Sequence, residues 1–442
     1  MDTLAIEGGK PLSGFIKPAG SRNSALKLIY AALFSSEEVV LENVPDVISI
    51  DEDLAVIRSI GAMAEWSGNN RLIISGAGIS SYEVPQEIGS RYRTAMLIAG
   101  PLLYRFGKAL LPKYLGEFSE QPYNRLLDTW ESLGIKVIDT GDHFLLDGSE
   151  AKGGQIHFKI PSHIGTDNAI LSSIFANGET EITNASEEGE VEDLINFCRL
   201  IGADISNPEP KKIKIKCASN FKGAKFLVQP DKIEIATFAI LAILTQGNIT
   251  IQGVNKTVVI PLVHLLDKMG AKFAFEGNDL KVWSNGEILS HVNVDITPTP
   301  GINSAWQSMV TLLLTQANGE SFVHDTVTIN GFGFVKDLNR MGARINLAKP
   351  TEVGLVPVIS DELYDLEKMG EPLSVARVEG PTKLKGTRLE ISDFRYGAVQ
   401  VAAALAAEGK SEVSGIEKVA KYMECFIPKL ESLGARIWKV QK

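Results

Sequence analysis

Polar residues near the predicted starts of helices offer most of the chemistry in this sequence. Gly165 and Thr166 precede a predicted helix at 167–176, where backbone N–H groups without an intrahelical acceptor can bind a phosphate. Arg22 and Asn23 open another predicted helix, where the arginine can bind an anion and the asparagine can instead cap the helix. These positions predict a site for an anionic ligand, with helix capping as the alternative.

Other candidates also have simpler structural interpretations. Asp231 and Glu234 stand in the first turn of a predicted helix, where they can bind a substrate hydroxyl or merely complement the helix dipole. His163 is a lone loop histidine, which is more often structural than catalytic. The alternation in Lys211–Lys216 is typical of an edge strand protected by lysines rather than of a nucleic-acid patch. Gly331–Gly333 is too short to predict a phosphate loop.

The composition argues against several classes of protein. The formal net charge of −10 argues against a nucleic-acid partner. Cys198, Cys217 and Cys425 form no C-x-x-C pair, so the sequence predicts no disulfide framework and no zinc site. We also expect no cofactor. No signal-peptide pattern is visible, and no apolar run reaches the ~20 residues of a membrane span. We therefore expect a cytoplasmic protein without a membrane partner.

One short phrase recurs six times along the chain. It consists of the end of an amphipathic helix, a glycine suited to a left-handed helix end, and a strand. Successive glycines are separated by 73, 68, 68, 72 and 92 residues, which is too regular for an accidental α/β joint and too long for a solenoid repeat. The glycines are Gly61, Gly134, Gly202, Gly270, Gly342 and Gly434.

The repeats predict two domains of mixed α/β structure. A chain of 442 residues exceeds one ordinary core, and six units divide naturally into two groups of three. We expect one domain at 21–228 and a second made of 1–20 and 229–442. Each unit is expected to contain helices and strands in a βαβαββ-like order.

Several phrases match one known family in order and spacing. They are IEGGKPLSG near the start, Gly20–Leu26, Arg93–Ala95, Gly100–Gly107, Pro230–Glu234, Ser392–Arg395 and Ala406–Gly409. On these phrases the chain resembles the enolpyruvyl transferases, and most closely those that act on UDP-N-acetylglucosamine. The resemblance implies a monomer with a two-lobed, inside-out α/β barrel fold and a ligand cleft between its lobes.

The resemblance also implies which residues carry the reaction. Moving an enolpyruvyl group from phosphoenolpyruvate to a sugar hydroxyl needs cationic groups for phosphate and carboxylate, an acid and a base. Arg22 stands where the family has a lysine, and Lys421 stands near the sequence position of the family's last active-site arginine. The implied catalytic residues are Arg22, Asn23, Arg93, Asp393 and Arg395.

Four positions depart from the family. Gly116 stands for its loop cysteine, Gln121 for the loop arginine, Ala305 for its aspartate and Gly331 for a further arginine. Each lost charged hydrogen bond should cost about 1.5–3 kcal/mol, and each lost acid or base about 10²–10⁴ in rate. The sequence therefore predicts that the parent reaction is altered or lost.

The segments that hold the nucleotide in the family match this sequence better than the catalytic segments do. By resemblance, the residues that hold uridine and diphosphate are Pro122, Tyr123, Asn124, Ser162, His163, Gly165 and Thr166, with Asp231 and Lys421 at the substrate. Tyr123 can stack on a base. We expect a divergent enolpyruvyl transferase homologue that binds a nucleotide or nucleotide sugar, with or without phosphoenolpyruvate. The alternatives are a non-catalytic nucleotide-binding paralogue and an enzyme with a shikimate-like acceptor.

Overall fold

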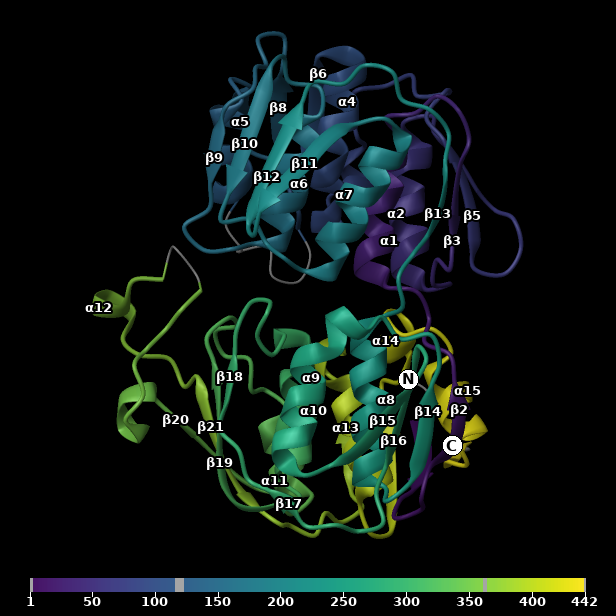
Figure 1. The fold of residues 1–442 in the computed structure, drawn as a ribbon, viewed down its shortest axis with the longest axis vertical. Helices are drawn as coiled ribbons and strands as arrows, with labels where there is room; N and C mark the ends of the chain where they lie inside the picture. Colours follow the sequence, from purple (N-terminus) through teal and green to yellow (C-terminus); the bar gives the residue numbers. More distant parts are fainter. Residues whose placement is uncertain (1–2, 116–122, 361–363, 441–442) are drawn as a thin grey trace. The chain divides into compact units, whose positions relative to one another are not determined.

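The computed structural model describes residues 3–115, 123–360 and 364–440 (Figure 1). The chain forms two compact units, of which unit 1 comprises Met1–Ala19 and Pro230–Lys442 and unit 2 comprises Gly20–Gln229. Each unit has its own cluster of buried apolar side chains. Each unit can therefore be described as a separate folded body.

The six sheets repeat one pattern, which explains the internal repeat of the sequence. In unit 2, β3 is antiparallel to β5, β5 is antiparallel to β4, and the edge strand β13 runs parallel to β3. The other sheets of unit 2 have the orders β6-β8-β7 and β11-β12-β10-β9. Their strands are β3 (Val39–Glu42), β4 (Met63–Trp66), β5 (Arg71–Ser75), β6 (Lys108–Pro112), β7 (Lys136–Asp139), β8 (His143–Asp147), β9 (Gln155–His157), β10 (Glu179–Thr183), β11 (Asp204–Glu209), β12 (Lys212–Lys216) and β13 (Lys225–Leu227).

Unit 1 repeats this pattern with strands taken from both ends of the chain. β1 lies between β23 and β24 and is antiparallel to both, so the N-terminal strand completes the last repeat. β2 is the parallel edge of the β15-β16-β14-β2 sheet. The third sheet has the order β17-β19-β21-β20, and β18 also pairs with β19. The strands are β1 (Thr3–Glu7), β2 (Ser13–Ile16), β14 (Asn248–Ile251), β15 (Lys272–Glu276), β16 (Asp279–Trp283), β17 (Leu289–Ser290), β18 (Val294–Ile296), β19 (Ala317–Asp325), β20 (Arg344–Ala348), β21 (Val375–Gly380), β22 (Arg388–Glu390), β23 (Lys410–Ser414) and β24 (Arg436–Lys439).

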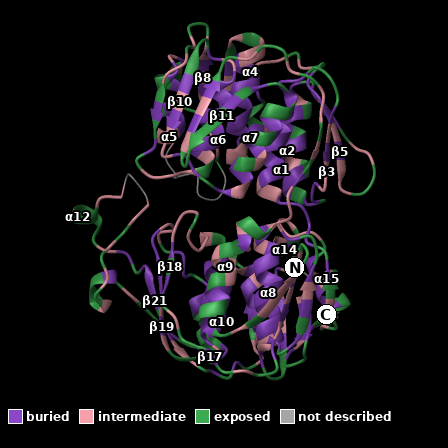
Figure 2. Cartoon of the chain, viewed as in Figure 1, coloured by how far each residue is buried: buried purple, intermediate pink, exposed green. Residues whose placement is uncertain are grey.

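Two kinds of helix alternate through the repeats. The first helix of most repeats is almost wholly buried, as α1, α8 and α10 show in Figure 2. The second helix buries one face only. The helices are α1 (Arg22–Ala32), α2 (Ile48–Ser59), α3 (Gln86–Gly89), the 3₁₀ helix η1 (Arg93–Ile98), α4 (Ala99–Phe106), α5 (Asn124–Ser132), α6 (His163–Ser173), α7 (Gly189–Ile201), α8 (Lys232–Leu244), α9 (Lys256–Met269), η2 (Ser304–Trp306), α10 (Gln307–Leu314), α11 (Val335–Arg340), η3 (Pro350–Val353), α12 (Leu366–Met369), α13 (Phe394–Ala406), α14 (Glu417–Ala420) and α15 (Phe426–Ser432).

The six glycines of the repeated phrase lie where the sequence predicts them. All six have positive φ, from 69° at Gly134 to 121° at Gly202, and each is followed directly by a strand. The long last interval of 92 residues has a simple cause. The described residues 349–360 and 364–374 lie outside the sheet between β20 and β21 and carry η3 and α12 (Figure 1), where the other repeats have short hairpins.

The prediction of an edge strand at Lys211–Lys216 was wrong. β12 lies inside its sheet, between β11 and β10. Lys212 and Lys214 lie 3.3 Å from the Glu181 carboxylate on β10, and Lys212 is also 3.3 Å from Glu209. The lysines therefore face glutamates across the strands rather than protecting an edge.

Candidate functional site

Arg22 and Asn23 lie in the first turn of α1, but neither caps the helix. Ser21 is the N-cap residue, and its hydroxyl accepts the amide of Ser24 at 3.3 Å. The capping alternative for Asn23 is therefore wrong. Asn23 instead accepts a hydrogen bond of 2.8 Å from Nη2 of Arg22 through its Oδ1 atom. The pair forms a half-buried polar group at the start of a buried helix.

Asp53 links three elements of unit 2 near this group. Its side chain on α2 is 1% exposed and accepts hydrogen bonds through Oδ1 from Tyr30 of α1 and from Thr94 of η1, the latter at 2.8 Å. Burial raises the pKa of Asp53 to about 6, against the opposing effects of these hydrogen bonds and of the Arg22 charge. Sequence reasoning missed Asp53 because nothing distinguishes it from other acids in an amphipathic helix.

Arg93 begins η1, one residue before Thr94. Its guanidinium lies 5.2 Å from the ring centroid of Tyr123, a cation–π distance. The Tyr123 hydroxyl accepts the amide of Tyr114 at 2.7 Å, and its ring packs edge-on against Phe144 at 5.1 Å. Tyr123 is therefore already held by three partners. Asn124 follows it as the first residue of α5.

The start of α6 differs from the prediction. The helix begins at His163, so Gly165 and Thr166 lie within its first turn instead of ahead of it. The Gly165 amide donates to the Ser162 hydroxyl at 3.2 Å, and the Thr166 amide donates to the Ser162 carbonyl at 2.8 Å. The prediction that these two amides are open to a phosphate was wrong. Thr166 is fully buried, and its hydroxyl accepts the amide of Ser186.

A buried ion pair joins α1 to α6. Nζ of Lys27 lies 2.6 Å from Oδ2 of Asp167, and the two side chains are 4% and 2% exposed. Lys27 is five residues after Arg22 and Asp167 is four after His163, so each lies about 6–8 Å along its helix from the start. The pair therefore links the parts of α1 and α6 that carry predicted site residues.

In unit 1, Asp393 and Arg395 bind each other. Asp393 is the N-cap of α13 and accepts the Arg395 amide at 3.0 Å. The guanidinium also donates to both carboxylate oxygens, at 3.1, 3.0 and 2.5 Å. Burial tends to raise the pKa of Asp393, but the bonds from Arg395 outweigh it and hold that pKa below its usual value. A ligand anion would have to compete with Asp393 for this arginine.

Gly331, one of the two positions of unit 1 that depart from the family, lies close to this pair. The Tyr396 hydroxyl, next to Arg395 in the chain, donates to the Gly331 carbonyl at 3.0 Å. Asp325 lies behind Gly331 and accepts Nε2 of Gln307 at 3.1 Å. Ala305 is exposed in η2, directly before α10, which begins at Gln307. The structure thus brings together three segments that are far apart in the sequence.

A side chain at position 331 would meet Asp325. A Cβ atom there would lie 2.7 Å from Oδ2 of Asp325 and 3.2 Å from Nε2 of Gln307. Asp325 is held by the amides of Val327 and Thr328, each at 2.9 Å, and it is 3% exposed. The carboxylate cannot easily move away. The space next to Gly331 is therefore anionic and closed to an arginine.

The remaining predicted residues of unit 1 are structural or peripheral. Asp231 is the N-cap of α8 and accepts the Ile233 amide at 2.7 Å. Glu234 forms a buried ion pair with Lys429 and accepts the Ala19 amide at 2.7 Å. Lys421 lies 5.7 Å from the ring of Tyr422, which stacks on Phe394 beside Asp393 and Arg395.

Some predictions fall outside the described ranges or concern other kinds of site. Pro122, Gly116 and Gln121 lie in the undescribed segment 116–122. Across the residues that are described, no group of three His, Cys, Asp or Glu side chains could hold a metal ion. Within the same ranges, no helix is long and apolar enough to cross a membrane.

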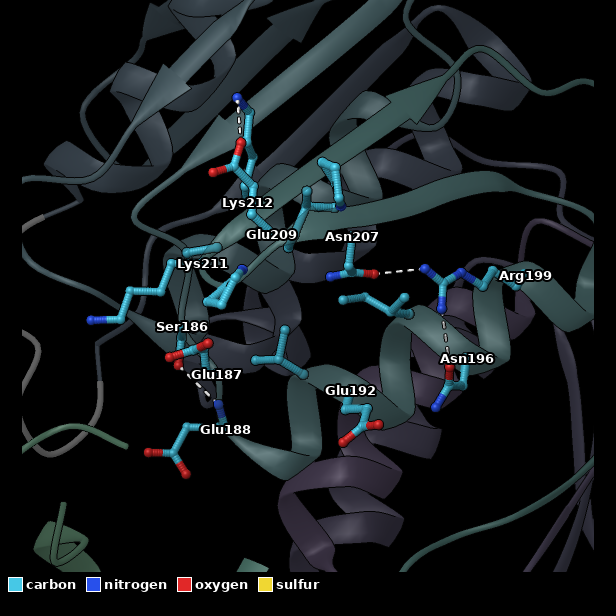
Figure 3. Close-up of a pocket in the computed structure, with 16 residues that line it drawn as sticks. Ser186, Glu187, Glu188, Glu192, Asn196, Arg199, Asn207, Glu209, Lys211 and Lys212 are labelled. Atoms are coloured by element: carbon cyan, nitrogen blue, oxygen red, sulfur yellow. Dashed lines mark hydrogen bonds and ion pairs between the residues drawn. The ribbon is translucent and has the colours of Figure 1, made fainter. Parts of the chain in front are cut away.

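Figure 3 shows a pocket of about 620 Å³ in unit 2, between α7 and the β11–β12 hairpin. Arg199 lies at one side of it and donates to Oδ1 of Asn207 at 2.6 Å and to the Ile205 carbonyl at 2.8 Å. Lys212 lies 3.3 Å from Glu209. None of the predicted site residues that the structure describes lines this pocket. It is therefore a feature separate from the predicted site.

Comparison with known proteins shows similarity over the whole chain. The family model for EPSP synthase (3-phosphoshikimate 1-carboxyvinyltransferase) matches residues 6–430. UDP-N-acetylglucosamine 1-carboxyvinyltransferase 2 of Carboxydothermus hydrogenoformans is 33% identical over 444 residues, which cover 100% of both chains. UDP-N-acetylglucosamine 1-carboxyvinyltransferase 1 of Legionella pneumophila is 28% identical over 98% of this chain and 81% of its own.

Two solved structures show the same fold. The enolpyruvyl transferase NikO from Streptomyces tendae has a TM-score of 0.85 at 22% identity and 99% coverage of both chains. EPSP synthase from Acinetobacter baumannii has a TM-score of 0.76 at 18% identity, with 100% coverage of both chains. Together with the family model, these matches confirm the resemblance predicted from the sequence motifs.

Proposed function

Because the chain belongs to the EPSP synthase family of enolpyruvyl transferases, we propose that it binds a nucleotide or UDP-sugar-like substrate and that its phosphoenolpyruvate chemistry is altered. The names of the curated relatives support the nucleotide sugar, since both are UDP-N-acetylglucosamine 1-carboxyvinyltransferases. We assign the binding of this nucleotide ligand to unit 2, through Arg22, Arg93 and the half-buried Tyr123.

The chemistry of unit 2 suits such a ligand. Arg93 and Tyr123 place a guanidinium beside an aromatic ring, and such a pair can serve a phosphate and a base. Arg22 and Asn23 add a second guanidinium and an amide at the start of a helix, where the backbone dipole also favours an anion. Ser162 and His163 at the start of α6 are the proposed diphosphate contacts.

The observation that carries the altered chemistry is the Asp325 carboxylate, which occupies the place where a side chain at position 331 would begin. The family's arginine at this position would have its Cβ 2.7 Å from a buried carboxylate oxygen. Ala305 lacks any proton-transfer group, and Arg395 is bound to Asp393. A missing acid or base lowers a rate by about 10²–10⁴, so unit 1 supports little of the parent reaction.

Calorimetry with UDP-N-acetylglucosamine, UMP, AMP and shikimate 3-phosphate tests the binding. We expect UDP-sugar binding that Arg93→Ala weakens about 10-fold or more, because a charged hydrogen bond is worth about 1.5–3 kcal/mol. Arg436→Ala is the matched control, since that arginine is exposed and pairs with Glu7. Absence of binding by every nucleotide at millimolar concentration would overturn the proposal, and binding of the shikimate ligand alone would favour the sister acceptor class.

A second candidate function, a nucleotide-binding paralogue without catalysis, is favoured by the same closed space at Gly331. Phosphate release from phosphoenolpyruvate, measured in the presence of whichever nucleotide binds, separates the two. Release at a rate far below that of a family enzyme supports an altered transferase. No release above the uncatalysed rate, with nucleotide binding intact, supports the binding protein.

A further inference from the structure

We propose that Asp53 is a positioning residue that sets the directions of Arg22 and Arg93 for anion binding. This inference rests on the proposed function of unit 2. Asp53 itself is 1% exposed and is placed to act through other groups, not on a ligand. The three elements α1, α2 and η1 meet at its side chain.

Asp53 is connected to α1 through Tyr30. Tyr30 is fully buried on α1 and donates its hydroxyl to Oδ1 of Asp53. Arg22 begins the same helix eight residues earlier, and its positive charge is a minor influence that opposes the rise of the Asp53 pKa. Through Tyr30, Asp53 therefore holds the helix from which the Arg22 side chain extends.

Asp53 is connected to η1 through Thr94. Thr94 donates its hydroxyl to the same oxygen of Asp53 at 2.8 Å. Arg93 is the neighbouring residue, so this hydrogen bond fixes the backbone from which its side chain extends. The Arg93 guanidinium then lies over Tyr123 at 5.2 Å. One buried oxygen atom thus holds the elements that present both arginines.

Charged and titratable groups surround Asp53. The charged and titratable groups that act on it are Arg22 and Tyr30 from α1, Glu52 from α2 and, before η1, Tyr92. Burial disfavours the charged carboxylate, and the two donors that it receives from the described residues are the neutral hydroxyls of Tyr30 and Thr94. Such an arrangement adds little stability but fixes geometry closely, as expected of a residue that orients others.

The test compares Asp53→Ala, Asp53→Asn and Tyr30→Phe in the full chain. Asn retains the acceptor oxygen and loses only the charge, whereas Ala loses both. We expect Asp53→Ala, which removes the acceptor of both the Tyr30 and the Thr94 hydroxyls, to weaken UMP and phosphoenolpyruvate binding at least 10-fold. A loss of this size is what a weakened hydrogen bond between an arginine and the ligand produces. Asp53→Asn keeps the acceptor and should stay within about threefold of wild type. Tyr30→Phe should fall between them.

A spectroscopic measurement separates positioning from general loosening. The Nε–H resonances of Arg22 and Arg93 should shift or broaden in Asp53→Ala. Those of Arg105 should not, because Arg105 in the same unit bonds the Leu33 carbonyl at 3.0 and 2.8 Å instead. Unchanged Arg22 and Arg93 signals, or equal changes at Arg105, would overturn the inference.

Failure of the proposed function gives a different result. If wild type binds no anion, the function falls, but the arginine resonances still decide whether Asp53 orients the two side chains. If wild type binds and Asp53→Ala binds equally well, only the positioning role is wrong. Should Asp53→Ala fail to fold, Tyr30→Phe and Thr94→Val, which each remove one donor, carry the same comparison.

Discussion

At the scale of single residues, Asp325 leaves no room for a side chain at position 331. Gly331→Ala should destabilise the protein by about 1–3 kcal/mol, the usual cost of overpacking, because the new Cβ would lie 2.7 Å from Oδ2 of Asp325. Urea unfolding measures this loss. Ala305→Asp, at an exposed position, is the control and should leave stability unchanged.

The conflict can be isolated with a double-mutant cycle. In an Asp325→Ala background the alanine at position 331 has room, so its penalty should largely disappear. Equal penalties in both backgrounds would show that the cost lies elsewhere in the loop. A stable Gly331→Ala protein would remove the argument that the arginine of the family is excluded here.

The sequence predicted candidate residues but not the contacts that they make. The family resemblance marked Asp393 and Arg395 as catalytic residues, and that they bind each other at the start of α13 was not predicted. The open amides of Gly165 and Thr166 were not found, since Ser162 caps α6, which begins at His163, four residues before the predicted start at 167. Asp53 and Asp325 could not be predicted, because their importance comes from partners that are distant in the sequence.

At the scale of elements, the Lys27–Asp167 pair joins α1 and α6 inside unit 2. Asp167→Asn would leave the Lys27 ammonium buried without its counter-ion, which typically costs about 3–5 kcal/mol. The double variant Lys27→Met/Asp167→Leu should recover most of this loss, because a buried ion pair is often no better than apolar packing. Thermal or urea unfolding at pH 7.5 provides the measurement.

The matched control for this pair is exposed. Lys383 and Glu408 lie 3.7 Å apart with side chains 84% and 68% exposed, so Glu408→Gln should produce no measurable change. A similar small effect for Asp167→Asn would mean that Lys27 finds another partner. If the double variant loses as much free energy of unfolding as Asp167→Asn does, the Lys27–Asp167 pair has a packing role that methionine and leucine cannot replace.

The element pattern was the most predictable part of the fold. The helix–glycine–strand phrase identified all six repeats, because a left-handed helix end requires glycine at a fixed place. The sheet order was not predictable. β1 pairs with β23 and β24 from the other end of the chain, and no local signal encodes such a partner. The central place of β12 was missed for the same reason.

At the scale of the whole molecule, the two units should differ in their ability to fold alone. Unit 2 is one continuous segment, so residues 20–229 should fold and unfold cooperatively. Residues 230–442 should not, because they lack β1, which lies between β23 and β24, and β2, which pairs with β14. Circular dichroism and amide exchange of both fragments test this difference.

A third fragment restores the missing strands. Ala19 accepts the Asp231 amide at 2.9 Å, so a short glycine–serine linker from residue 19 to residue 230 can join 1–19 to 230–442. This joined chain should fold. If 230–442 folds equally well without the N-terminal segment, the contribution of β1 and β2 to unit 1 is smaller than their central and edge places imply.

Finally, buried carboxyl groups should make the protein more stable at mildly acidic pH than at pH 8. Burial raises the pKa of Asp53, Asp167 and Asp193 to about 6 and that of Glu234 to about 7, above the ~3.9 and ~4.3 of unfolded aspartate and glutamate. Their contribution to stability is fully present below pH ~4 and is lost as the pH rises through 6 to 7, at up to ~3 kcal/mol per group. A carboxylate with a lowered pKa acts in the opposite sense: Glu287, whose pKa of about 2 reflects its bond from Lys272, loses its contribution as the pH falls from ~4.3 toward 2. The urea midpoint should therefore rise from pH 8 to a maximum near pH 5. Asp53→Asn should flatten part of that slope and raise stability at pH 8. A wild-type midpoint that increases from pH 5 to pH 8 would contradict the assignment of the buried carboxyls as the controlling groups.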